Sequence, residues 1–175
     1  MTRARKHSRK TSAPSFHPRS VLVDANLMLV FVVGSYEPFY VSKHKNTRGY
    51  SSEDFYLLRE LLAQTHARIT TPHILTEVSN LLAQSEGPVK RSCFRAFAEV
   101  IGVFDEVHVA ARRIALRDHF ADFGLTDLGI LEAADSTCLV ITADSRLASY
   151  LGREHFHVID FKQLVDRDRP SSRGR

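Results

Sequence analysis

The sequence predicts an α/β fold in which a central parallel sheet of about five strands carries helices on both faces. Two observations favour it. Short apolar runs typical of buried strands alternate with amphipathic helical segments from Ser20 onward. At 175 residues, of which 43% are hydrophobic, the chain is also long enough for one domain with a full core. The expected strands cover residues 21–23, 67–71, 106–109, 138–142 and 157–161.

Apolar spacing and capping residues indicate the helices of the first half. Residues 27–33 form an apolar run too short to cross a membrane, and we interpret them as a buried helix. Ser52, followed by acidic residues, is expected to cap a helix over residues 52–62. Pro72 stands near the start of the next helix, whose apolar face holds Ile74, Leu75, Val78, Leu81 and Leu82.

The expected helices of the second half cover residues 89–103, 110–120, 126–135 and 144–151. Gly87 and Pro88 separate the first of these from the helix before it. Thr126 is the expected N-cap of the third, after a loop that ends at Gly124. The buried face of the first is expected to hold Phe94, Phe97, Val100 and Ile101.

Basic residues are concentrated at the two ends of the chain. Residues 1–20 carry six Lys or Arg and no acid, and residues 166–175 carry four Arg against two Asp. The remaining 145 residues hold 14 basic and 18 acidic side chains. We expect residues 1–19 to be a disordered basic tail and residues 166–175 an Arg-rich tail. Such tails attract nucleic acid without sequence preference, although a merely solvated terminus has the same composition.

The composition predicts a cytoplasmic protein that does not engage a membrane. The chain shows neither a secretory signal nor an apolar run of membrane-spanning length. Its two cysteines, Cys93 and Cys138, are too few and too widely spaced for a disulfide framework or a zinc site. We expect both to be buried free thiols in a reducing compartment.

Four acidic residues, Asp24, Glu77, Asp127 and Asp144, stand where an α/β sheet could gather them. Asp24 and Asp144 each follow an expected strand, and α/β sheets place their sites at the carboxyl ends of strands. Glu77 lies in the second turn of its helix, and Asp127 directly follows the expected cap. Taken singly, Asp127 and Asp144 also suit helix capping, and Glu77 a solvated helix position. Asp24 after a buried strand has no such simple explanation.

A convergence of these four acids predicts a divalent-metal site. Carboxylates gathered without cations repel one another, and Mg²⁺ or Mn²⁺ relieves that repulsion with hard oxygen ligands. Such ions activate water and stabilise the leaving oxygen of a phosphodiester. Asn26, two residues after Asp24, is placed to orient water or phosphate. The sequence therefore predicts a metal-dependent enzyme that acts on phosphate esters.

The segment over residues 33–51 interleaves aromatic and cationic side chains. Lys43, Lys45 and Arg48 are its expected contacts to nucleic-acid phosphates, beside Tyr and Phe rings that suit base stacking. The alternative is a surface loop that packs its aromatic side chains on the body of the protein.

Four motifs resemble, in their order and spacing, those of the PIN domain, a metal-dependent ribonuclease family that includes many bacterial toxin–antitoxin toxins. They are Val-Asp24-Ala-Asn26, Thr76-Glu77-Val, Leu125-Thr-Asp127 and Ile141-Thr142-Ala-Asp144. The resemblance covers nearly the whole body of the chain, from about Ser20 to Phe161. The long segment over residues 33–51 and the two basic ends depart from the compact toxin pattern.

The resemblance implies a PIN-like three-layer nuclease domain over residues 20–165 and endonucleolytic cleavage of RNA. It implies that the four acids are catalytic and bind Mg²⁺ or Mn²⁺. It also implies that Asn26 and Thr142, at small polar positions of the family, contact substrate. A cognate antitoxin and a second copy of the chain are the partners expected besides RNA. The alternative is a non-catalytic PIN-like module that binds RNA or a protein.

Overall fold

The computed structural model describes residues 16–168 and confirms the expected α/β fold. All five strands pair in parallel, in the order β3-β2-β1-β4-β5. A parallel sheet between helical layers is the three-layer, PIN-like arrangement that the sequence predicts. Most of the predicted N-terminal tail and residues 169–175 lie outside the described residues. The strands are β1 (Ser20–Val23), β2 (Ala67–Thr70), β3 (Asp105–Glu106), β4 (Cys138–Thr142) and β5 (His157–Asp160).

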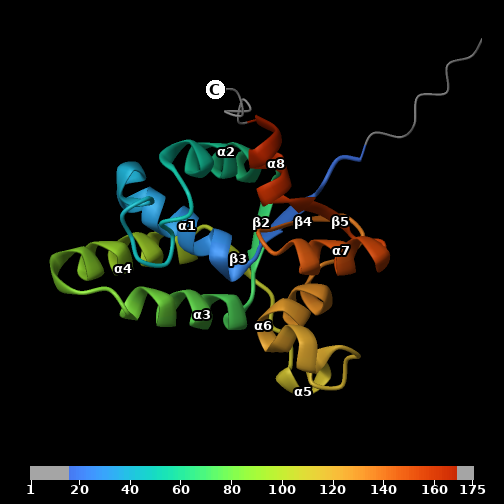
Figure 1. Ribbon diagram of the computed structural model, residues 1–175. Coiled ribbons are helices and arrows are strands. Elements are labelled where there is room, and N and C mark those ends of the chain that lie inside the picture. The colour runs from blue at the N-terminus through green and yellow to red at the C-terminus, as the bar shows by residue number, and fades with distance from the viewer. Residues whose placement is uncertain (1–15, 169–175) are drawn as a thin grey trace, which may run out of the picture.

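Helices cover both faces of the sheet: α1 to α4 gather on one side, and α6 and α7 on the other (Figure 1). None of the helices within the described part of the chain is long and apolar enough to cross a membrane. The helices are α1 (Ala25–Tyr36), η1 (Pro38–Tyr40), α2 (Ser52–Ala63), α3 (Pro72–Ala83), α4 (Gly87–Ile101), α5 (Ala111–Ile114), α6 (Phe120–Ala133), α7 (Ser145–Arg153) and α8 (Phe161–Asp168).

Helix α1 forms the centre of the core. Its residues 27–33 are buried on every side, because α1 packs against α2, α3 and α4 as well as against β4. This explains why the run is apolar all round instead of amphipathic. At Gly34 a Cβ atom would overlap the ring of Phe55 in α2, so the glycine permits the close approach of the two helices. The prediction of a buried helix over residues 27–33 is confirmed.

The strand order reverses between β1 and β4, next to Asp24. The chain steps outward from β1 through β2 to β3, crosses back, and continues in β4 and β5 on the other side of β1. Right-handed crossovers then place helices on opposite faces on either side of this point, which leaves a crevice at the carboxyl ends of the strands. Asp24 lies in it, and its backbone N–H donates to the Ile141 carbonyl at 3.1 Å.

Three element boundaries differ from the prediction. The N-cap of α2 is Ser51, not Ser52, because Ser51 and Asp54 form a reciprocal capping box. Strand β3 has two residues, since it lies at the edge of the sheet with only β2 beside it. The helix expected over residues 110–120 shrinks to the four residues of α5, of which Ile114 alone is buried.

Helix α6 begins earlier than predicted and is bent. It starts at Phe120, and Gly124 interrupts it with a left-handed backbone, φ 75° and ψ −167°. Gly124 is therefore a kink between two helical stretches and not the end of a loop. Thr126 lies just after the kink, inside α6, so the predicted cap is wrong although the helical turn that carries Asp127 is present.

Two further outcomes concern side chains and the last helix. Cys93 and Cys138 are buried free thiols, as expected. Ile101 was expected on the buried face of α4, but it is 38% exposed because it is the last residue of that helix. Phe161, expected to end the last strand, instead begins α8, which continues into the predicted C-terminal tail.

Candidate acidic site

Asp24 is buried and held by three hydrogen bonds. Its Oδ1 accepts from the Leu27 backbone N–H at 2.8 Å, which caps α1. Its Oδ2 accepts from the Thr142 hydroxyl at 2.5 Å and from the Ala143 N–H at 2.7 Å. Burial raises the pKa of Asp24 above its usual value, the three hydrogen bonds oppose the rise, and the charge of Asp144 adds to it. The carboxyl group is thus fixed between β1 and β4.

Thr142 links two of the acids. Its hydroxyl donates to Asp24 and accepts from the backbone N–H of Asp144 at 3.0 Å, and the residue is fully buried. The hydroxyl therefore sets the position of Asp24 and of the turn that carries Asp144. The substrate contact predicted for Thr142 would require this hydroxyl to leave both partners.

Asp144 is exposed and caps α7. Its Oδ1 accepts from the backbone N–H groups of Arg146 at 2.8 Å and of Leu147 at 3.1 Å. The helix-capping role expected as an alternative for Asp144 is confirmed, but capping uses only one of its two carboxylate oxygens. Oδ2 makes no hydrogen bond with any residue in the described part of the chain.

The capping and chemical roles of Asp144 can be separated by two substitutions. Asp144→Ala removes the cap and is expected to destabilise the protein by about 1 kcal/mol, whereas Asp144→Asn keeps an acceptor and stays within about 0.5 kcal/mol. Both variants lose the negative charge of the carboxylate. Urea unfolding measures the first effect, and equal stability of the two variants would contradict the capping geometry.

Asp127 is the acid whose pKa the charges of the other three acids raise. It is partly buried, and burial raises its pKa to about 7, with further increases from the charges of Asp24, Asp144 and Glu77. Arg146 opposes this rise. Within residues 16–168 the Asp127 side chain makes no hydrogen bond or ion pair. The charges of Asp24, Asp144 and Glu77 thus act on Asp127, a carboxyl group that no donor within residues 16–168 satisfies.

Glu77 lines a pocket beside Asp127. The pocket has a volume of about 290 Å³ and lies between α3 and α6. Pro72 begins α3 as expected, and Thr71, which was expected to end the strand, is its N-cap. Glu77 therefore falls in the second turn of α3 and faces α6. The other lining residues are His73, Thr76, Asn80, Leu125 and Thr126. The position of Thr126 in this wall places the pocket next to Asp127.

The chemistry of this donor set suits a hard divalent cation. All four side chains offer carboxylate oxygens, and the raised pKa of Asp127 reflects its burial first and then the negative charge of the other three acids, which Arg146 only opposes. Across residues 16–168, no three His, Cys, Asp or Glu side chains are arranged to hold a metal ion by themselves. Mg²⁺ commonly keeps several waters and uses one or two carboxylates together with substrate phosphate. The acids fit that mode of binding.

Two residues that the sequence analysis did not assign to the site act on it. Burial raises the pKa of Tyr50 to about 12, and the charges of Asp24 and Asp54 contribute to the rise. Its hydroxyl thus stays protonated near the acids. Arg146 lies two residues after Asp144 and acts on Asp127. The sequence could have indicated Arg146 as a site residue, because it lies two residues after Asp144. For Tyr50 the sequence offers no such indication beyond its aromatic neighbours.

Lys43, Lys45 and Arg48, the predicted phosphate contacts, are exposed in the turns after η1, and their side chains make no hydrogen bond or ion pair with a described residue. Tyr50, two residues after Arg48, lies close enough to Asp24 for the charge of Asp24 to raise its pKa. The segment packs inward through His44, whose Nε2 lies 2.8 Å from Ser85 Oγ. Asn26, by contrast, is exposed in the first turn of α1, beside Asp24.

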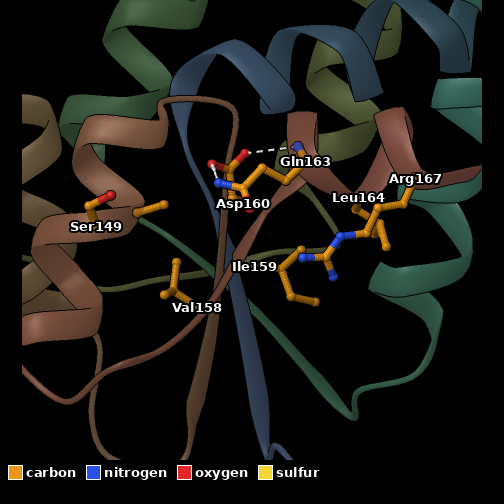
Figure 2. Close-up of a pocket in the computed structure, with 8 residues that line it drawn as sticks. Ser149, Val158, Ile159, Asp160, Gln163, Leu164 and Arg167 are labelled. Carbon is orange, nitrogen blue, oxygen red and sulfur yellow. Dashed lines mark hydrogen bonds between the residues drawn. The ribbon is translucent and has the colours of Figure 1, made fainter.

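A separate hollow of about 390 Å³ lies among α7, β5 and α8 (Figure 2). Its lining contains one acid, Asp160, whose carboxylate points toward Gln163. Asp160 accepts from the Gln163 N–H at 3.1 Å and from its side-chain amide at 2.9 Å. Burial raises the pKa of Asp160, but hydrogen bonds from Ser145 and Gln163 outweigh it and lower the pKa. This acid caps α8, so the hollow is not the candidate site.

Comparisons with known proteins leave the site to be interpreted on its own geometry. No protein-family model matches the chain, and no curated protein matches it.

Proposed function

We propose that this protein is a Mg²⁺- or Mn²⁺-dependent endoribonuclease that hydrolyses RNA phosphodiester bonds. The observation that carries the proposal is Asp127, a carboxyl group without a hydrogen-bond partner in residues 16–168, whose pKa three other acids help to raise to about 7. A structural cluster of acids would be satisfied by protein donors, as Asp24 is. Acids that lack hydrogen-bond donors at the carboxyl ends of parallel strands favour a site that binds a cation and a substrate.

The residues have distinct roles in this proposal. Asp127, Glu77 and Asp144 would hold the ion, and Asp24 would face it from its fixed position. A bound ion would supply positive charge for the phosphate oxygens and lower the pKa of a water molecule. Asn26 is exposed beside Asp24 and orients phosphate or water by hydrogen bonding. Tyr50 retains its proton and lies close enough to Asp24 for the charge of Asp24 to raise its pKa.

The non-catalytic module is the competing function. It shares the fold and explains an exposed basic surface, but it gives no reason for leaving Asp127 unsatisfied. A cognate antitoxin and a homodimer remain predictions from the resemblance to PIN domains.

The proposal is tested by incubating purified full-length protein with single-stranded RNA, a structured RNA and DNA of matching sequence. Each is assayed with Mn²⁺, with Mg²⁺ and with EDTA. We expect internal cleavage of RNA with either metal and intact RNA with EDTA. Binding of RNA without cleavage under all metal conditions would instead support the non-catalytic module.

A further inference from the structure

Two arginines on α7 are each held against an aromatic ring. The guanidinium carbon of Arg146 lies 4.6 Å from the centre of the Phe123 ring, and that of Arg153 lies 5.8 Å from the centre of the Tyr150 ring. The two rings stack on one another, with centres 4.9 Å apart and planes inclined by 22°. Cation–π contacts of this kind orient a guanidinium without using its hydrogen-bond donors.

Most of the donors of these arginines stay available. Arg146 Nη2 donates to the Asp122 carbonyl at 2.6 Å and lies 3.7 Å from Asp122 Oδ1, yet 60% of the Arg146 side chain is exposed. Asp122 is shared, because its Oδ2 lies 3.0 Å from His119 Nδ1. Arg153 is exposed and makes no hydrogen bond or ion pair within residues 16–168, although Glu154 follows it. A guanidinium fork of this kind matches the geometry of a phosphate group.

Arg146 and Arg153 lie at increasing distance from the acidic site along α7. Asp144 caps the start of that helix, Arg146 lies in its first turn, and Arg153 lies seven residues further, about 10 Å along the axis. Helix α7 runs beside α6, on the face of the sheet opposite α1 to α4 (Figure 1). Nucleic acid leaving the acids over α7 therefore meets Arg146 first and Arg153 next.

We propose that Arg146 and Arg153 form a phosphate-binding track, the α7 track, for single-stranded RNA. Arg146 contacts a phosphate next to the acids, and Arg153 contacts a phosphate further along the strand. This inference rests on the proposed ribonuclease function, since it takes RNA at the acidic site as the substrate. It adds two phosphate contacts to those predicted for Lys43, Lys45 and Arg48.

The test measures RNA affinity of the full-length protein against salt concentration, in EDTA, with a fluorescent single-stranded RNA. The test variant is Arg146→Gln with Arg153→Gln. The matched control is Arg91→Gln with Arg95→Gln, an identical change of charge at two exposed positions of α4. Removing one cation that binds a phosphate of a single strand reduces the slope of log K against log salt by about 0.7, so the test pair is expected to reduce it by about 1.4. The control pair should leave it within about 0.3.

A third variant, Arg146→Lys with Arg153→Lys, keeps both charges. It is expected to retain the wild-type slope, which distinguishes the removal of phosphate-binding charge from damage to the stacked rings. Equal effects of the test and control pairs, or an unchanged slope in the test pair, would overturn the α7 track. RNA cleavage with Mn²⁺ separates the two proposals. Cleaved RNA with unaffected track variants refutes the track alone, and a reduced slope without any cleavage refutes the ribonuclease alone.

Discussion

Asp127→Asn is expected to reduce metal-dependent RNA cleavage about a thousandfold, equivalent to about 4 kcal/mol of transition-state stabilisation. The substitution keeps the size of the side chain but removes the charge on which Asp24, Asp144 and Glu77 act. In the absence of metal the variant should be at least as stable as the wild type, because it relieves repulsion and breaks no hydrogen bond with a described residue. Activity and stability thus change in opposite directions.

The comparison with Asp24 explains the choice of Asp127. An asparagine at position 24 would set its amide N–H group against donors that now point at the carboxylate, from Leu27, Thr142 and Ala143. An unsatisfied buried donor costs about 1–3 kcal/mol, so activity lost in Asp24→Asn mixes chemistry with folding.

The control for Asp127→Asn is Asp118→Asn, which makes the same charge change at an exposed residue before α6. Initial cleavage rates of the three proteins are measured at equal Mn²⁺ concentration, with circular dichroism to verify folding. Cleavage by folded Asp127→Asn within threefold of the wild-type rate would show that this residue is not part of the active site.

The stability of the metal-free protein is expected to fall as pH rises from about 5 to 8. The pKa of Asp127 is about 7 in the folded chain against 3.8 in the unfolded chain, so the folded state binds more protons across that interval. Stability is therefore lost with rising pH and becomes constant above about 8. We expect the loss to be about 2 kcal/mol, since one side of the group is open to solvent and salt.

Other titratable groups also make stability depend on pH, so the contribution of Asp127 is measured as the difference between wild type and a variant. Burial lowers the pKa of His44, which makes stability rise with pH over part of the same interval. Asp135 and Asp160 have lowered pKa values and titrate below it. Urea unfolding at pH 5, 6, 7 and 8 is therefore compared between wild type and Asp127→Asn. The variant should show a smaller loss, because only the contribution of Asp24, whose pKa is also raised, remains. Identical pH profiles would contradict the electrostatic coupling around Asp127.

Divalent metal should reverse this trend in the wild type. Bound metal and protons compete for the same carboxylates, so Mn²⁺ is expected to stabilise the protein more at pH 8 than at pH 5. At a concentration of 100 times its dissociation constant, the gain is about 2.7 kcal/mol.

The sequence could locate the acids because their signals are local. Asp24 and Asp144 directly follow apolar strands whose parallel pairing brings their carboxyl ends together, and this alone places both at one edge. Asp127 was found through an expected cap at Thr126 that the structure corrects, but Asp127 still lies in a helical turn, because the helical stretch that carries it begins just after the kink at Gly124.

The surroundings of the acids could not be predicted because they depend on long-range packing. Tyr50 approaches the site while packing on Phe161, and their ring centres are 6.5 Å apart. Phe161 begins α8, where the sequence analysis expected a strand end and a tail. Asp160, followed by Gln163, carries the spacing of a capping box and was the available signal for that helix.

Direct binding of Mn²⁺ tests the central claim, that Asp24, Glu77, Asp127 and Asp144 form one divalent-cation site. Electron paramagnetic resonance of Mn²⁺ titrated into metal-free protein at pH 8 measures it, because the sharp signal of free Mn²⁺ disappears on binding. The wild type is expected to remove Mn²⁺ from solution with saturation at one or two ions per chain. Asp127→Asn should weaken that binding at least tenfold, and Asp118→Asn should leave it unchanged. Equal binding by wild type and Asp127→Asn, or no saturable binding by the wild type, would contradict the account.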